Sequence, residues 1–293
     1  MPVDDRTWAR YLEWCLSSDL APSTAEKSGR YLRFFEREHG LELGDRAPSR
    51  ERVIQLLSSS RARGVKPKTL NSWVRELNLW SRFNSLGWKM AYFRRRGHPV
   101  IQVPDDRIIR ALRRLRWANP STSARNRALL ALLSDQGPRR NEVVHLDLSD
   151  RRKTADGRPV VTVRFGKGEK ERLLYIDEST DQLLEEYVQR YRIDSDPRAL
   201  FTAPRGRLSY AYLARIVKEA GDRVGAPWLS PHKLRHYVCD SLLDAGVSVP
   251  SVAEVLGHVR WETTALYRSR RLATVRAEQE VRAASRARFG GPK

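Results

Sequence analysis

The chain has 293 residues, 40% of them hydrophobic and eight of them tryptophan, which is enough to fill a core in each of two domains. The chain has 55 lysines and arginines but only 35 acidic residues, which gives a net charge of +20. This charge predicts a polyanionic partner, and nucleic acid fits better than an anionic membrane. Without a spanning apolar run, a signal-peptide core or paired cysteine spacing, the sequence predicts a cytoplasmic protein that has neither a disulfide framework nor a zinc ribbon.

Four helices are predicted in the first ninety or so residues, because apolar residues recur there at the helical period. The first carries Trp8 to Cys15, the second runs from Pro22 to Gly40, the third from Ser49 to Gly64, and the fourth from about Pro67 to before Gly87. Proline at the first turn and glycine after the last are typical helix boundaries. We therefore expect a compact helical bundle with basic outer faces.

A charge run with Gly97, Pro99 and Pro104 then interrupts the periodicity, and we interpret 93–104 as an interdomain linker. Alternation in "RPVVTVRF" and "ERLLYI" around "GKGEK" predicts a β-hairpin with glycines at its turn. Helices are predicted at about 105–116, 122–134, 179–192, 209–221, 231–245, 249–257 and 262–269. The second domain is therefore expected to be mostly helical with a small sheet.

The segment "HKLRH" admits three interpretations. His232 and His236 have the i, i+4 spacing of a zinc site, but Lys233 stands where such a site would have its glutamate base. His232 and Arg235, at i and i+3, are suited to binding an anion, since a guanidinium can donate to two phosphate oxygens. The third interpretation is an ordinary solvated basic face.

Other candidate residues also have ordinary structural explanations. Arg139 at the start of a short helix, with Glu142 three residues on, can be a surface ion pair, and Lys167 can be a solvated turn lysine. His258, directly after a glycine, can be a helix cap, and Tyr267 can be a core residue. Taken one at a time, none of these residues shows whether its role is structural or functional.

Together these segments resemble the tyrosine recombinases, also called phage-integrase or Xer-type site-specific recombinases. The family signature runs TGLRxxE, GKGxKxR, PHxLRH and then LGH, with a tyrosine nine residues beyond the last histidine. This chain has "QGPRRNE", "GKGEKER", "PHKLRH" and "LGHVRWETTALY" in the same order. The resemblance spans the whole chain, because "LAPSTAEKSGRYLRFFEREHG" near its start also looks like the family's core-binding domain.

The resemblance implies a mainly α fold with a small β-sheet. A helical, SAM-like core-binding domain is expected over 1–92, the linker over 93–104, and a mixed α+β catalytic domain with a C-terminal tail over 105–293. The implied active site consists of Arg139, Lys167, His232, Arg235, His258 and Tyr267, with Glu142 orienting Arg139.

The resemblance also implies a role for each group. Tyr267 is the nucleophile, Lys167 protonates the departing 5′-oxygen, and Arg139 and Arg235 bind the non-bridging phosphate oxygens in place of a metal. His232 acts as a base or acid at the phosphate, and His258 donates a hydrogen bond to it.

Pro138 departs from the family pattern, which usually has leucine before the first arginine, and Gln136 stands where threonine is common. Proline suits the first position of a helix, which favours Arg139 over Arg140 as the working residue. His236 is expected to be structural. The interval of about sixty-five residues from the hairpin to "PHKLRH" favours a compact Xer-like member, and we expect no arm-binding domain before the bundle.

The implied function is site-specific DNA recombination, for integration, excision or resolution, through a 3′-phosphotyrosyl intermediate and a Holliday junction. The implied partners are double-stranded DNA, a homotetramer on two recombination sites, and an accessory or second recombinase protein; no metal, other cofactor or membrane is expected. The tail after Arg270 is either a helix that docks on a neighbouring protomer or a disordered basic segment. Two other functions stay open: a catalytically silent DNA-binding clamp and a type IB topoisomerase.

Overall fold

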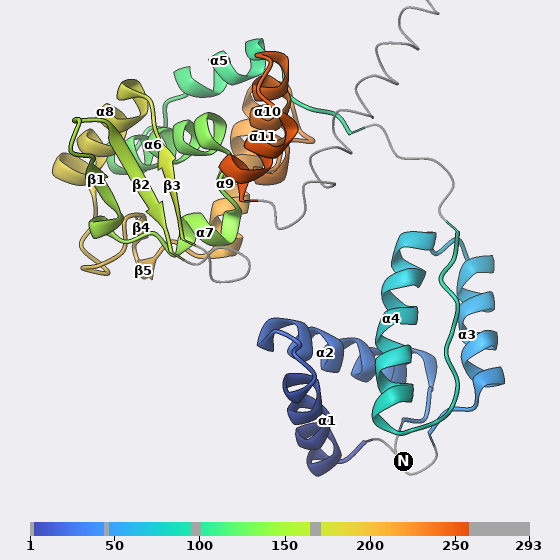
Figure 1. Cartoon of the computed structure of the whole chain (residues 1–293). Coiled ribbons are helices and arrows are strands. Elements are labelled where there is room, and N and C mark those ends of the chain that lie inside the picture. The colour runs from blue at the N-terminus through green and yellow to red at the C-terminus, as the bar shows by residue number, and fades with distance from the viewer. Residues whose placement is uncertain (1–2, 44–46, 95–100, 165–170, 258–293) are drawn as a thin grey trace, which may run out of the picture. The chain divides into compact units, whose positions relative to one another are not determined.

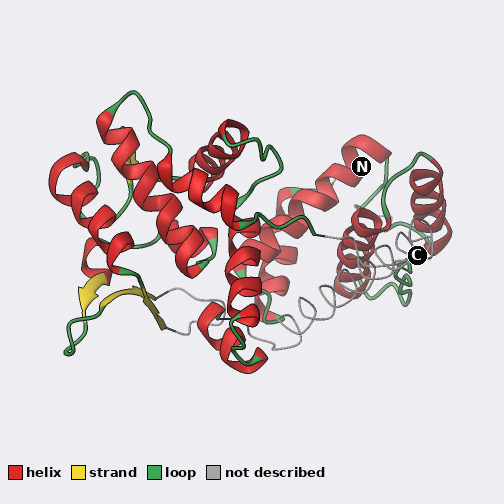
Figure 2. Ribbon diagram, turned by 90° about the horizontal axis from the view of Figure 1, so that it is seen from above, coloured by secondary structure: helices red, strands yellow, loops and turns green. Residues whose placement is uncertain are grey.

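The computed structural model describes residues 3–43, 47–94, 101–164 and 171–257. The chain divides into two compact units, Met1–His98 and Pro99–Lys293 (Figure 1). The described residues are mainly helical, as the sequence predicted, and include two small sheets (Figure 2). No helix in these described ranges is long and apolar enough to cross a membrane.

The first unit consists of helices in its described part, and all four predicted helices are confirmed. They are α1 (Asp5–Ser17), α2 (Pro22–His39), α3 (Arg50–Ala62) and α4 (Pro67–Phe83). The side chains of Asp4 and Ser49 accept hydrogen bonds from the first turns of α1 and α3, and Gly40 ends α2 in the left-handed conformation. The boundaries thus follow from local capping chemistry.

Aromatic side chains form the centre of this unit. Trp80 of α4 is fully buried, and its ring centroid lies 5.5 Å from that of Trp8 and 5.1 Å from that of Tyr11, both on α1. Tyr11 also shares a buried hydrogen bond of 2.6 Å with Ser28 of α2. Each of these large rings buries a large apolar area, which helps to stabilise so small a unit.

Two asparagines of α4 hold the segment that follows it. Asn78 exchanges two hydrogen bonds with the backbone of Met90, and Asn71 exchanges two with the backbone of Phe93. Phe93, the first residue of the predicted linker, is therefore bound to the first unit. Residues 95–100 of that linker lie outside the described residues, and the domain boundaries given above stay a prediction.

The second unit is built around α6 (Pro120–Gln136), eleven of whose residues are buried. Helices α5, α8 and α10 pack around it. The other helices are α5 (Asp106–Arg114), α7 (Arg140–Val144), α8 (Glu178–Glu186), α9 (Tyr210–Arg223), α10 (Pro231–Asp244) and α11 (Val249–Leu256). Because most of α6 is buried, it is the core element against which the functional segments are placed.

The predicted β-hairpin is confirmed and belongs to a larger sheet. Its strands β2 (Pro159–Val163) and β3 (Arg172–Tyr175) are antiparallel, and β1 (Arg151–Lys153) extends the sheet in the order β1-β2-β3. A two-stranded sheet, β4 (Thr202–Ala203) with β5 (Gly206–Arg207), was not predicted, and neither was β1. The glycine-containing turn of the hairpin lies outside the described residues.

The bounds of several helices differ from the predicted ones, and α6 and α8 are the clearest cases. The helix predicted at 122–134 starts earlier, at Pro120, because Asn119 caps it by accepting a hydrogen bond from the backbone of Thr122. The helix predicted at 179–192 is regular only to Glu186, and Tyr187–Tyr191 form a π-helical turn. The helix predicted at 262–269 lies outside the described residues.

Candidate active site

Arg139 is placed by the junction between α6 and α7. Gly137 ends α6 in the left-handed conformation (φ 56°), and Arg139 is the N-cap of α7 with extended backbone angles. The expectation that Pro138 is the first helical residue was wrong, because Pro138 precedes the cap and Arg140 is the first helical residue. The predicted helix start at Arg139 is nevertheless present.

Arg235 approaches the same junction from α10. Its side chain is buried, with 4% of the residue exposed, and its Nη1 donates to the Gly137 carbonyl at 2.8 Å. A Cβ at Gly137 would lie 3.2 Å from both the Cα of Arg235 and the Cβ of Val238, so glycine allows α10 to pack closely here. Gly137 thus serves both to end α6 and to admit Arg235.

The two arginines converge on the end of α11. Arg235 donates through Nη2 to the carbonyl of Leu256, and Arg139 donates through Nη2 to the carbonyl of Gly257. Gly257 is the left-handed C-cap of α11 and directly precedes His258. The fold therefore brings together guanidinium groups from α7 and α10 at the described end of α11.

Glu142 is the acidic centre of this cluster. Its side chain is 1% exposed, and its Oε2 accepts from the Arg139 backbone N–H at 2.6 Å while its Oε1 accepts from the Arg139 Nη1 at 2.7 Å. Burial raises the pKa of Glu142, but hydrogen bonds and charge from Arg172 and Arg139 outweigh it and hold the pKa below its usual range. Glu142 is thus a carboxylate that fixes Arg139.

Arg172, the first residue of β3, binds the same carboxylate. Its Nη1 and Nη2 donate to Oε1 and Oε2 of Glu142 at 2.9 and 2.6 Å. Sequence analysis did not assign this residue, although it is the last letter of the quoted "GKGEKER" motif. Two guanidinium groups therefore bind this one carboxylate, and Arg235 adds a third positive charge at the end of α11. The excess positive charge suits an anionic ligand.

His232 lies one turn before Arg235 on α10 and is exposed, whereas His236 is buried. Their rings make an edge-to-face contact with centroids 4.4 Å apart. No group of three or more histidine, cysteine or acidic side chains with metal-binding geometry occurs among the described residues. Lys233 reaches away from the cluster, because its Nζ donates to the carbonyl of Gln102.

Three predicted site residues, Lys167, His258 and Tyr267, lie outside the described residues. The structure brings together Arg139, Arg235 and Glu142, adds Arg172, and places His232 on the helix of Arg235. Arg140, the alternative to Arg139, lies over the ring of Tyr210 with its Cζ 3.2 Å from the ring centroid, and the ring belongs to α9. Arg139 is therefore the arginine that joins Arg235 at the end of α11, each donating to its own carbonyl.

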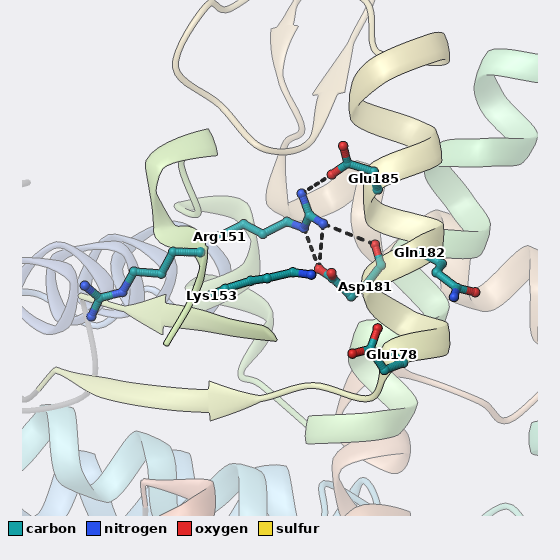
Figure 3. A pocket seen from close by; sticks show the side chains of 7 residues that line it. Arg151, Lys153, Glu178, Asp181, Gln182 and Glu185 are labelled. Atoms are coloured by element: carbon teal, nitrogen blue, oxygen red, sulfur yellow. Dashed lines mark hydrogen bonds and ion pairs between the residues drawn. The ribbon is translucent and has the colours of Figure 1, made fainter. Parts of the chain in front are cut away.

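A separate pocket of about 380 Å³ lies between β1 and α8 and contains none of the predicted site residues (Figure 3). Arg151 there is paired with Asp181 and Glu185, so its charge is matched by carboxylates. This pairing distinguishes the pocket from the arginine cluster at α7, α10 and α11, where positive charge is in excess.

Comparison with known proteins supports a single family. The model of the phage integrase family matches residues 106–273. Tyrosine recombinase XerC of Corynebacterium glutamicum is 38% identical over 151 residues, which cover 51% of this chain and 48% of that protein. Tyrosine recombinase XerA of Pyrococcus furiosus is 27% identical over 224 residues, covering 75% of this chain and 76% of the relative. The chain spans about half the length of the first of these relatives.

Solved structures show the same fold. A XerH site-specific recombinase bound to its difH substrate aligns with a TM-score of 0.65 at 17% identity, covering 90% of this chain and 86% of that one. A lambda integrase (75–356) dimer bound to a COC′ core site also aligns at 0.65, with 16% identity and coverage of 88% and 96%. These alignments confirm the predicted fold class, and the family match over most of the second unit shows that the chain belongs to the phage integrase family.

Proposed function

We propose that this protein is a site-specific DNA recombinase that cuts and rejoins strands through Tyr267. The observation that carries the proposal is the convergence of Arg139 and Arg235 at the end of α11, one residue before His258. Two fixed guanidinium groups can bind the two non-bridging oxygens of a phosphodiester and stabilise the charge that develops there.

The chemistry follows from an in-line displacement. The phenolic oxygen of Tyr267 forms a bond to phosphorus as the bond from phosphorus to the 5′-oxygen breaks, which leaves a 3′-phosphotyrosyl link. Lys167 gives its proton to the departing 5′-oxygen, and His232 takes the phenol proton. Attack by a 5′-hydroxyl from a second duplex reverses these steps and joins the exchanged strands.

The net charge of +20 and the DNA present in the two solved relatives support double-stranded DNA as the substrate. We propose that four copies act on two recombination sites and exchange strands pairwise through a Holliday junction, with an accessory or second recombinase protein as a further partner. The lambda integrase fragment was solved as a dimer on one core site, which agrees with two copies per site.

Covalent trapping tests this function. Labelled DNA fragments that flank the protein's own gene, some nicked so that the leaving strand diffuses away, are incubated with the protein in EDTA and run on a denaturing gel. We expect a shifted band with the wild-type protein and none with Tyr267→Phe. Binding on a native gel without any adduct would instead support a catalytically silent DNA-binding clamp.

The topoisomerase alternative shares the strand-cleavage step and needs a different test. A type IB topoisomerase relaxes any supercoiled plasmid, whereas a recombinase needs its own site. We expect relaxation or recombination only of a plasmid that carries the trapped fragment. Equal relaxation of a plasmid without that fragment would favour the topoisomerase.

A further inference from the structure

We propose that Arg172 is a positioning residue that holds Arg139 and the base of the Lys167 hairpin in the geometry needed for DNA cleavage. The inference rests on the proposed function, because it assigns Arg172 a role in that same site. It goes beyond the six residues and the single carboxylate that the sequence analysis assigned.

A double hydrogen bond joins Arg172 to Glu142. Both terminal nitrogens of Arg172 donate to the two oxygens of the carboxylate, at 2.9 and 2.6 Å, and the Arg172 side chain is 12% exposed. Such a fork fixes the plane of the carboxylate. Since Glu142 holds the backbone and the guanidinium of Arg139, its orientation determines that of Arg139.

Arg172 also packs closely against Gly257. A Cβ built on Gly257 would lie 2.9 Å from Nη1 and 3.1 Å from Cζ of Arg172, so the guanidinium packs directly against this backbone. The carbonyl of Gly257 accepts from Arg139. Arg172 therefore contacts both groups that hold Arg139, the carboxylate on one side and the end of α11 on the other.

Arg172 also lies at the base of the β2–β3 hairpin. Arg172 begins β3 and is paired with Val163, the last residue of β2, and the turn that carries Lys167 connects these two strands. The fork to Glu142 thus ties the base of that turn to the start of α7. One side chain links the hairpin, α7 and the end of α11, the three segments that carry Lys167, Arg139 and His258.

A merely structural ion pair is the competing explanation, and Arg151 provides the matched control. Arg151 lies in the same sheet, is 18% exposed, and binds Asp181 and Glu185 rather than Glu142 (Figure 3). Arg151→Ala therefore removes a similarly half-buried arginine and its acidic contacts without touching the candidate site.

The test compares Arg172→Lys, Arg172→Ala and Arg151→Ala in the full-length protein. The rate of adduct formation is measured under single-turnover conditions at saturating nicked DNA, together with the dissociation constant for DNA and the melting temperature. Arg172→Lys keeps the charge but loses the fork, so we expect its cleavage rate to fall about 10- to 100-fold, the usual effect of losing an orienting partner. DNA affinity should change less than threefold or so, since Arg139 and Arg235 remain.

A second substrate carries a methyl group in place of one non-bridging oxygen of the scissile phosphate. The ratio of cleavage rates on the two substrates should not change if a variant only affects folding. This phosphate is neutral, so it depends less on correctly placed arginines. We expect the deficit of both Arg172 variants to shrink on this substrate, as it should for Arg139→Ala. Arg151→Ala should cleave both substrates at the wild-type rate.

Two results would overturn the inference in different ways. If the wild-type protein forms an adduct and Arg172→Lys cleaves as fast as Arg151→Ala, Arg172 is structural and the proposed function stands. If the wild-type protein forms no Tyr267-dependent adduct on any fragment, the proposed function and the inference fail together.

Discussion

Asn78 and Met90 are joined by two hydrogen bonds that replace a strand partner: Asn78 Nδ2 donates to the Met90 carbonyl at 3.0 Å, and the Met90 N–H donates to Oδ1 at 2.7 Å. Both groups are buried. Asn71 repeats the arrangement with Phe93 two turns earlier on α4. The segment after α4 is therefore held along that helix by side-chain amides.

Asn78→Ala should destabilise the first unit, because it leaves a buried donor and a buried acceptor without partners, at about 1–3 kcal/mol for each group. Urea unfolding of the full-length protein, followed by tryptophan fluorescence, measures the effect. Asn84→Ala is the control, since its Nδ2 makes one hydrogen bond to the Trp80 carbonyl at the partly buried end of the same helix. If both variants lost the same free energy of unfolding, the two hydrogen bonds between Asn78 and Met90 would add no particular stability.

Arg139→Ala should reduce the single-turnover rate of adduct formation by about 100- to 1,000-fold, as expected when a donor to the developing charge is removed. Arg140→Ala should change it little, because Arg140 stacks on Tyr210 instead of joining the carbonyls at the end of α11. The two variants differ by one position and lose the same charge. A larger loss for Arg140→Ala would mean that Arg140, and not Arg139, acts on the phosphate.

Gly257→Ala should impair cleavage more than it impairs folding. Its backbone is left-handed (φ 64°), and its new Cβ would lie 2.9 Å from Arg172 Nη1. Gly225→Ala is a matched control with φ 73° and nothing within 4 Å, so it carries the same backbone strain of about 1–2 kcal/mol without the clash. Melting temperatures should fall alike while only Gly257→Ala loses adduct formation. Equal cleavage by both variants would contradict the close approach of Arg172.

The stabilising effect of Glu142 should depend on pH. Burial raises its pKa, but Arg172 and Arg139 together lower it below the ordinary value. When the pKa of a carboxyl is lower in the folded than in the unfolded protein, its ionised form stabilises the fold. This stabilisation is complete above the pKa of the unfolded state and is lost as the pH falls through the pKa of the folded state. The wild-type protein should therefore exceed Glu142→Gln in free energy of unfolding by the largest amount near neutral pH, and this difference should decrease in acid. Urea unfolding over a pH series measures it, and a gap that widens in acid would contradict this assignment.

The sequence predicted elements whose signals are local. The four helices of the first unit follow from apolar period, proline starts and a glycine end, and the β2–β3 hairpin follows from alternation. Strand β1 has the sequence "RRK" and carries no alternation, so only pairing with β2 makes it a strand. The π-helical turn after α8 likewise has no simple local signal.

The site shows the same division between local and tertiary information. Arg139, Glu142 and Arg235 stand out because each belongs to a short motif, and the capping of α7 by Glu142 is a local contact. The role of Arg172 depends on a partner 30 residues earlier and on the backbone of Gly257. An arginine in an alternating strand usually indicates a solvated position, and only the packing of three segments shows otherwise.

The hydrogen bonds at the end of α11 restrict where residues can be inserted into the chain or deleted from it. Arg235 and Arg139 use two consecutive carbonyls, of Leu256 and Gly257, and successive residues of a helix differ by about 100° in direction. Inserting or deleting one residue within α11 would turn both acceptors away, and the two positive charges would lose the negative end of the helix that offsets their repulsion. The exposed turn between β1 and β2 carries no such constraint, so insertions there should be tolerated and α11 should keep its length.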